Sequence, residues 1–171
     1  MELRSRQVVA RVVLVLTILA TIGCDRVTKH VATQTLAGTA GRSYLADTVR
    51  FSYAQNTGGF LGLGSDLPPA ARTAVFTGAT GIALLGLIAF GARLNRGGWP
   101  AFGLTLFFAG SLSNWLDRLI RGSVVDFMIV GVGPLRTGIF NVADVAILLG
   151  VAIFVTAEYR RERLPGTVNT R

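Results

Sequence analysis

Residues 14–29 read LVLTILATIGCDRVTK. They follow a short N-terminal run that carries Arg4, Arg6 and Arg11. An apolar run with arginines before it is typical of a membrane-spanning helix. Whether this run stays as a helix or is removed as a signal decides what the polar residues after it do.

The order of basic flank, apolar run, small residue and Cys24 resembles a bacterial lipoprotein signal, which is cut before a lipid-bearing cysteine. Such a signal usually has leucine or a similar aliphatic residue three positions before the cysteine, where this chain has Thr21. Three further apolar segments follow, so nothing requires a cleaved export signal. We therefore expect residues 8–24 to remain as a transmembrane helix and Cys24 to be a small packing residue.

The composition predicts a multi-span membrane protein with one domain, residues 1–171. The chain is 51% hydrophobic and 15% charged, well below the roughly 25% charged residues of soluble proteins. A net charge of +8 in a soluble protein would suggest nucleic acid. Here the arginines flank apolar segments, so we expect them to set topology and meet anionic phospholipid instead. With one cysteine and one histidine, the chain predicts no disulfide, metal or cofactor site.

Four apolar segments predict four transmembrane helices. They cover residues 8–24, 73–92, 99–116 and 139–159. An even number of spans puts both termini on one side, and the basic RLNRGG turn, RRER tail and N-terminus favour the cytoplasm. The outer loops are then residues 25–72 and 117–138, and the tail 164–171 is expected to be disordered. Within the first loop, the alternating stretch TVRFSYAQN predicts a short strand or hairpin lying on the membrane.

The positions of two aspartates beside the predicted spans require an explanation, because charged residues there are energetically costly and often functional. Asp126 lies in GSVVDFMIV and Asp144 in FNVADVAILLG, both near the predicted outer face. Each alone would be read as an interfacial carboxylate held by an arginine or a helix N-terminus. Two aspartates that converge form a known catalytic pair, in which one carboxyl group keeps a proton while the other activates water against an amide.

Other polar residues gather at the same predicted face. Asn141 lies three residues before Asp144, on the same helical face. Structural roles in helix packing or capping are as plausible as a site role for the asparagines. The i, i+4 spacing of Asp25 and Lys29 alone predicts a surface ion pair worth less than about 1 kcal/mol. The remaining candidates lie in AQNTGGF and SNWLDR: Asn56, Gly58, Asn114 and Arg118.

The ordered blocks DRVTK, QNTGGF, NWLDR, VVDF and FNVAD resemble those of the lipoprotein signal peptidases, the signal peptidase II family. The resemblance implies an all-α polytopic fold of four transmembrane helices with a small extracytoplasmic β-rich cradle, in the bacterial inner membrane. It implies an aspartyl endopeptidase that cuts diacylglyceryl-modified prolipoproteins before the lipidated cysteine. It also implies binding of globomycin-like cyclic peptide inhibitors.

The same resemblance implies roles for residues. Asp126 and Asp144 would be the catalytic dyad. Asp25 and Lys29 would brace the outer end of the first span. Residues that line or order the site would be Asn56, Gly58, Asn114, Arg118 and Asn141. The family block N-x-G-A-A-F is one residue shorter here, and Ser113 stands where the family commonly has glycine.

One chain contains every expected site residue, so we expect a monomer. The alternative reading is a small proton-coupled carrier that uses the same two carboxylates as a relay. Carriers usually place such a group at the bilayer midplane and contain repeated halves. No repeat is visible in this sequence, and both aspartates lie toward one face.

Overall fold

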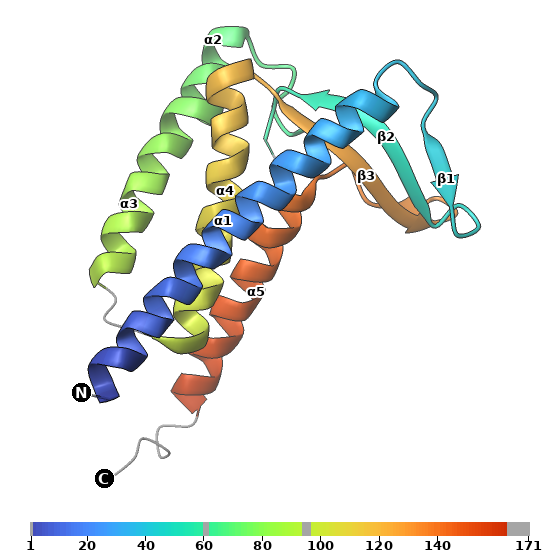
Figure 1. The fold of residues 1–171 in the computed structure, drawn as a ribbon. Coiled ribbons are helices and arrows are strands. Elements are labelled where there is room, and N and C mark those ends of the chain that lie inside the picture. The colour runs from blue at the N-terminus through green and yellow to red at the C-terminus, as the bar shows by residue number, and fades with distance from the viewer. Residues whose placement is uncertain (1, 60–61, 94–96, 164–171) are drawn as a thin grey trace.

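The computed structural model describes residues 2–59, 62–93 and 97–163. Helices form an elongated bundle, and a small sheet projects from one end of it (Figure 1). The start of α1 and the end of α5 lie together at the opposite end of the bundle. The predicted disordered tail, residues 164–171, lies outside the described residues.

The first helix is longer than the sequence predicts. α1 (Glu2–Leu36) continues through Cys24 for twelve more residues, so the predicted outer loop begins only after it. Cys24 is exposed on this helix and is not a packing residue. The extension has a physical cause, because Ala32 and Leu36 bury themselves against Phe127 of the sheet.

The predicted segments 73–92 and 99–116 also lie within longer helices, whereas the segment predicted at 139–159 is displaced, since its helix begins at Val142 and ends at Arg163. Pro69 occupies the first position of α2, where its missing N–H and fixed φ suit a helix start. Gly122 ends α4 in the left-handed conformation, and its N–H bonds to the Arg118 carbonyl. The elements are α2 (Pro69–Arg72), the π-helix η2 (Thr73–Ala79), α3 (Thr80–Arg93), α4 (Gly98–Arg121) and α5 (Val142–Arg163).

Three of the four predicted membrane segments coincide with helices long and apolar enough to cross a membrane. These are Ser5–Leu36, Pro69–Gly91 and Val142–Arg163. α4 has 24 residues, which is sufficient length, but its C-terminal half contains Asn114, Asp117 and Arg118. The first two of these side chains are buried inside the protein. A fourth span through α4 therefore stays a prediction.

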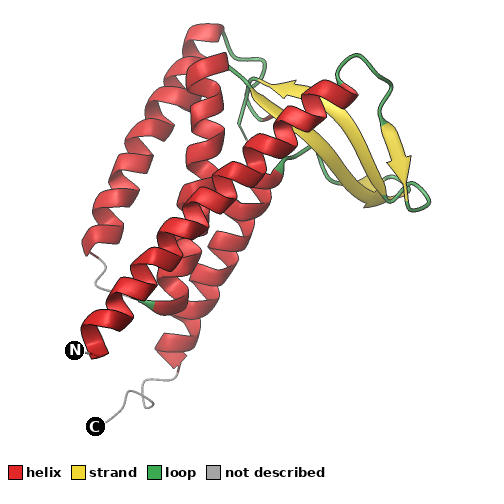
Figure 2. Ribbon diagram, viewed as in Figure 1, coloured by secondary structure: helices red, strands yellow, loops and turns green. Residues whose placement is uncertain are grey.

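The small sheet is antiparallel, in the order β1-β2-β3-β4 (Figure 2). The strand predicted from TVRFSYAQN is confirmed as β2 (Val49–Asn56), which pairs with β3 (Val124–Val132). Short strands β1 (Arg42–Tyr44) and β4 (Leu135–Arg136) flank this pair. The register places Asn56 opposite Val124, so the end of β2 meets the start of β3 beside the end of α4.

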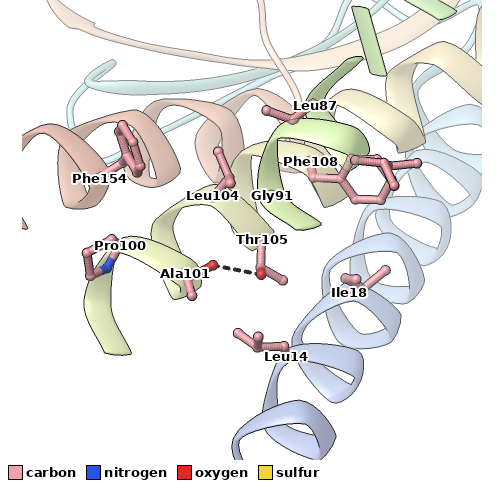
Figure 3. Close-up of a pocket in the computed structure, with 11 residues that line it drawn as sticks. Leu14, Ile18, Leu87, Gly91, Pro100, Ala101, Leu104, Thr105, Phe108 and Phe154 are labelled. Atoms are coloured by element: carbon pink, nitrogen blue, oxygen red, sulfur yellow. Dashed lines mark hydrogen bonds between the residues drawn. The ribbon is translucent and has the colours of Figure 1, made fainter. Parts of the chain in front are cut away.

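An apolar hollow lies between α3 and the other helices of the bundle (Figure 3). The hollow measures about 270 Å³ and is lined by residues of α1, α3, α4 and α5. Its hydroxyl-bearing residue, Thr105, donates to the carbonyl of Ala101, so that polar group is satisfied within its own helix. A surface of this kind is compatible with hydrocarbon.

α4 and α5 are the most closely packed pair of helices, and glycines make that approach possible. A methyl group built on Gly103 would lie 2.8 Å from the Gly150 carbonyl oxygen and 2.7 Å from the Phe154 nitrogen. One built on Gly110 would lie 2.5 Å from the carbonyl oxygen of Ala143. Small residues at such positions let helix backbones meet in lipid.

We predict that Gly103→Ala destabilises the protein. The added carbon has only backbone and a branched side chain as neighbours, so the helices must separate, and overpacking of this kind costs about 1–3 kcal/mol. The thermal midpoint in detergent should fall by several degrees.

The matched control is Gly86→Ala on α3. An added carbon at Gly86 meets nothing within 4 Å, and alanine favours a helix by about 0.5–1 kcal/mol over glycine. The control should leave the midpoint unchanged or raise it. Equal midpoints for the two variants would show that the α4–α5 contact does not limit stability.

Candidate active site

The pairing of β2 with β3 positions the first aspartate. Asp126 lies on β3 opposite Ala54, beyond a register shift between Phe51 and Ala54. The side chain of Asn56, at the end of β2, donates from Nδ2 to Asp126 Oδ2 at 2.9 Å and to the Gly59 carbonyl. Asp126 is 1% exposed, so the strand pair holds a buried carboxylate.

The N-terminus of α5 positions the second aspartate through a capping arrangement. Asn141 precedes the helix, and its Oδ1 accepts the Asp144 N–H at 3.0 Å. Asp144 reciprocates, because its Oδ2 accepts the Asn141 N–H at 3.0 Å. This exchange satisfies two N–H groups that a helix start would leave free, and it fixes the Asp144 carboxylate.

Asn141 also joins the two aspartates. Its Nδ2 donates to Asp126 Oδ1 at 2.6 Å, while its backbone N–H serves Asp144. One residue thus sets the position of a carboxylate on a strand and a carboxylate on a helix. Asp126 and Asp144, predicted as a dyad from their sequence blocks, lie on either side of this single residue.

Asn114 completes the surroundings of Asp144 from α4. Its Nδ2 donates to Asp144 Oδ1 at 2.9 Å. Its Oδ1 accepts from Lys29 Nζ at 2.8 Å and from Asn141 Nδ2 at 3.2 Å. The amide orientation is therefore determined by a cation on one side and a carboxylate on the other.

The ion pair between Asp25 and Lys29 is buried, which corrects the interpretation based on spacing alone. Asp25 is 0% exposed and Lys29 2% exposed, and Nζ lies 2.7 Å from Asp25 Oδ2. Lys29 also contacts Asp117 at 2.7 Å, so its ammonium has three oxygen partners including Asn114. A buried cation needs this satisfaction, because unpaired charge in the interior is very costly.

Asp25 links α1 to both α4 and α5. Its Oδ1 accepts the N–H of Ala143, another free donor of the α5 N-terminus, at 2.9 Å. Its Oδ2 accepts the Ser113 hydroxyl at 2.7 Å. Ser113 therefore has a partner inside the network.

Gly58 and Arg118 hold the loop after β2. The Gly58 N–H donates to Asn56 Oδ1, and its carbonyl accepts from Arg118 Nη2 at 2.6 Å and Nε at 3.2 Å. A side chain at Gly58 would collide with the Leu63 carbonyl, 2.5 Å from the added carbon. The loop turns so tightly that only glycine fits at this position.

All nine residues that the sequence singles out lie in one connected hydrogen-bond network. The sequence reasoning did not single out Asp117 or Arg26, although Arg26 Nη1 contacts Asp117 Oδ1 at 2.7 Å and both belong to that network. The available signal was helical spacing, since Asp117 follows Asn114 by three residues within the quoted block NWLDR.

Burial raises the pKa of Asp126 above its ordinary value, and the hydrogen bonds from Asn56 and Asn141 oppose that shift. A buried carboxyl group with a raised pKa keeps a proton more readily than an exposed one. Two buried carboxyl groups beside each other suit general acid–base chemistry on a bound amide. Among residues 2–59, 62–93 and 97–163, no three His, Cys, Asp or Glu side chains cluster as metal ligands would.

Comparisons with known proteins show the family to which the chain belongs. The model of the signal peptidase (SPase) II family matches residues 17–160. The lipoprotein signal peptidase of Streptococcus pneumoniae is 30% identical over 161 residues, which cover 94% of this chain and 97% of that protein. The lipoprotein signal peptidase of Mycobacterium tuberculosis is 34% identical over 159 residues, 89% of this chain and 70% of its own.

A solved bacterial membrane enzyme shares the fold. Its TM-score is 0.79 at 23% identity, over 93% of this chain and 94% of that one. The family match covers the helices and strands that carry the network, from α1 to α5. The chain belongs to the signal peptidase II family, the lipoprotein signal peptidases.

Proposed function

We propose that this chain is an aspartic endopeptidase that removes the signal peptide from diacylglyceryl-modified prolipoproteins, cutting before the lipidated cysteine. The observation that carries the proposal is the bridge through Asn141, which holds the buried Asp126 and Asp144 side by side. Membership of the signal peptidase II family supplies the substrate class.

In the proposed reaction, one carboxylate removes a proton from water while the oxygen attacks the scissile carbonyl carbon. The other carboxyl group donates its proton to the carbonyl oxygen and the tetrahedral intermediate forms. Collapse of this intermediate breaks the C–N bond: the protonated base delivers its proton to the leaving amine, and one hydroxyl of the intermediate returns its proton to the carboxylate that had acted as the acid. The residues that fix the two carboxylates do so from three elements: Asn56 on β2, Asn114 on α4 and Asn141 before α5.

We place the site at the outer face of the bacterial inner membrane. The end of the bundle opposite the sheet carries Arg6, Arg93 and the basic last turn of α5, and positive charge favours the cytoplasm. Both termini would then be cytoplasmic and the sheet extracytoplasmic. α4 would be the fourth span, since its buried polar side chains face protein partners and not lipid.

The substrate's signal helix would enter laterally from the bilayer, with its diacylglyceryl chains remaining in lipid. A helical backbone satisfies its own amides, so the segment at the cut must unwind before an amide reaches the two aspartates. One chain supplies the whole network, which supports a monomer. Cyclic peptides of the globomycin type would compete at the same place.

We predict that Asp126→Asn and Asp144→Asn each abolish cleavage. Removing a general acid or base lowers the rate by about 10²–10⁴-fold. The measurement is a gel-shift assay with purified protein and a diacylglyceryl-modified prolipoprotein, beside the same substrate without lipid. The lipidated substrate alone should be cut, and only by the parent.

The control for this experiment is Asp66→Asn, which changes an exposed aspartate outside the network. It should cleave as the parent does. Substantial activity in either dyad variant with an unchanged thermal midpoint would contradict the proposed dyad. A folded parent that does not cut but moves protons across liposomes would support the carrier alternative.

The raised pKa of Asp126 predicts the pH profile. The pair needs one shared proton, so activity should decline on the alkaline side when that proton is lost, at an apparent pKa above the ordinary aspartate value. The hydrogen bond from Asn56 lowers the pKa of Asp126, so Asn56→Ala should move this alkaline limb to higher pH. The measurement is kcat/KM against pH.

The control is Gln55→Ala on the same strand, whose side chain bonds to the Tyr53 hydroxyl and, among the residues that the structure describes, to no member of the network. Its limb should coincide with that of the parent. The position of the limb is independent of how far Asn56→Ala reduces the rate. A limb that stays in place or moves to lower pH would contradict the assignment of the titrating group to Asp126.

A further inference from the structure

A second, polar pocket lies beside the site and takes no part in the proposed chemistry. It measures about 200 Å³ and lies between η2 and the end of α4. In Figure 1 these segments meet at the end of the bundle that carries the sheet. Its polar lining comes from Thr57, Arg72, Thr73, Thr77 and Arg118.

The two arginines make this pocket cationic. Arg72 donates from Nη1 to the Thr57 hydroxyl at 2.7 Å and to the Ser65 carbonyl at 3.2 Å, both uncharged acceptors. Arg118 likewise donates to the carbonyls of Gly58 and Asn114. Within the described part of the chain, neither guanidinium forms an ion pair with a carboxylate, and no acidic side chain lines the pocket.

A guanidinium has five donors in a planar fork, and Arg72 uses one nitrogen in its bonds to residues that the structure describes. The free edge of such a fork matches the paired oxygens of a phosphate. Asp126, Asp144 and Asp117 attract Arg118 electrostatically, but none of them lines the pocket. The pocket is therefore complementary to an anion with several oxygens.

The depth of the pocket in the proposed membrane indicates which kind of molecule carries the anion. Arg72 lies in the first turn of the apolar helix Pro69–Gly91, at its end near the sheet. Under the proposed placement this is the level of the lipid headgroups, where long basic side chains meet phosphate.

We propose that Arg72 and Arg118 bind the phosphate of an anionic phospholipid, and that the bound lipid orders the loop that carries the site. The proposal rests on the membrane placement given above but not on the peptidase chemistry. Three hydrogen bonds connect the pocket to Asp126. Arg72 bonds to Thr57, Arg118 bonds to Gly58, and the adjoining Asn56 bonds to Asp126.

Trp115 offers a direct readout of binding. Its indole N–H donates to the carbonyl of Thr77, a lining residue, at 2.8 Å. The full chain with Trp99→Phe has Trp115 as its only tryptophan. Titration of this protein in detergent with short-chain phosphatidylglycerol should give a saturable fluorescence change, and Arg72→Gln should weaken binding at least about tenfold.

The matched control is Arg93→Gln, which removes one positive charge at the other end of the same helix. It should bind as the parent does. An equal loss in both variants would mean general surface electrostatics and would overturn the site. No saturable change in the parent would overturn it as well. Inorganic phosphate that binds as tightly as phosphatidylglycerol would overturn the lipid assignment.

A second arm measures cleavage in nanodiscs of phosphatidylcholine alone or mixed equally with phosphatidylglycerol. Anionic lipid should raise the activity of the parent and of Arg93→Gln severalfold, and this gain should be lost in Arg72→Gln. A gain that persists in Arg72→Gln would overturn the coupling. If the parent cleaves nothing, the peptidase proposal fails, and the fluorescence arm still decides the lipid site.

Discussion

The burial of one lysine ammonium constrains the arrangement of the whole bundle. Lys29 is 2% exposed and has three oxygen partners, Asp25, Asn114 and Asp117. Removing one partner of a buried ion pair costs about 3–5 kcal/mol, because the remaining charge is left uncompensated. α1 and α4 can therefore pack in one register only, and Asp25 extends the constraint to α5 through the N–H of Ala143.

That register decides where the asparagines lie. With Lys29 fixed, the Asn114 oxygen must face the cation, so its nitrogen must face Asp144. Asp144 in turn is fixed to Asn141, which reaches Asp126 on a strand from a separate part of the fold. The site is thus precise because its donors and acceptors are matched within one connected network, and polar networks of this kind specify a single arrangement.

Much of this was predictable from the sequence, and the limits have physical causes. The apolar segments and the β2 strand follow from patterns within short stretches, and the nine residues of the network follow from the sequence blocks that resemble the family. The end of α1 does not, because Asp25 and Lys29 look like the end of a membrane segment unless Asp117, 88 residues after Lys29, is known to lie beside them. The same missing partner made a buried ion pair look like a surface one. α4 is not among the helices apolar enough to cross a membrane by composition. Its polar residues have partners on other helices, which the sequence does not reveal.

Charge balance gives an independent reason for a shared proton at the proposed dyad. The network contains four carboxyl groups, Asp25, Asp117, Asp126 and Asp144, and two cations that form ion pairs with them, Arg26 and Lys29. Four ionised carboxylates would leave an excess of negative charge in a buried region, where Coulomb repulsion is weakly screened. One proton reduces this excess. Asp25 and Asp117 each hold a cation directly, so the proton belongs to the pair that has only amide donors, Asp126 and Asp144. The ion pairs made by α1 thus favour one shared proton at Asp126 and Asp144, which is the state that the proposed water activation requires.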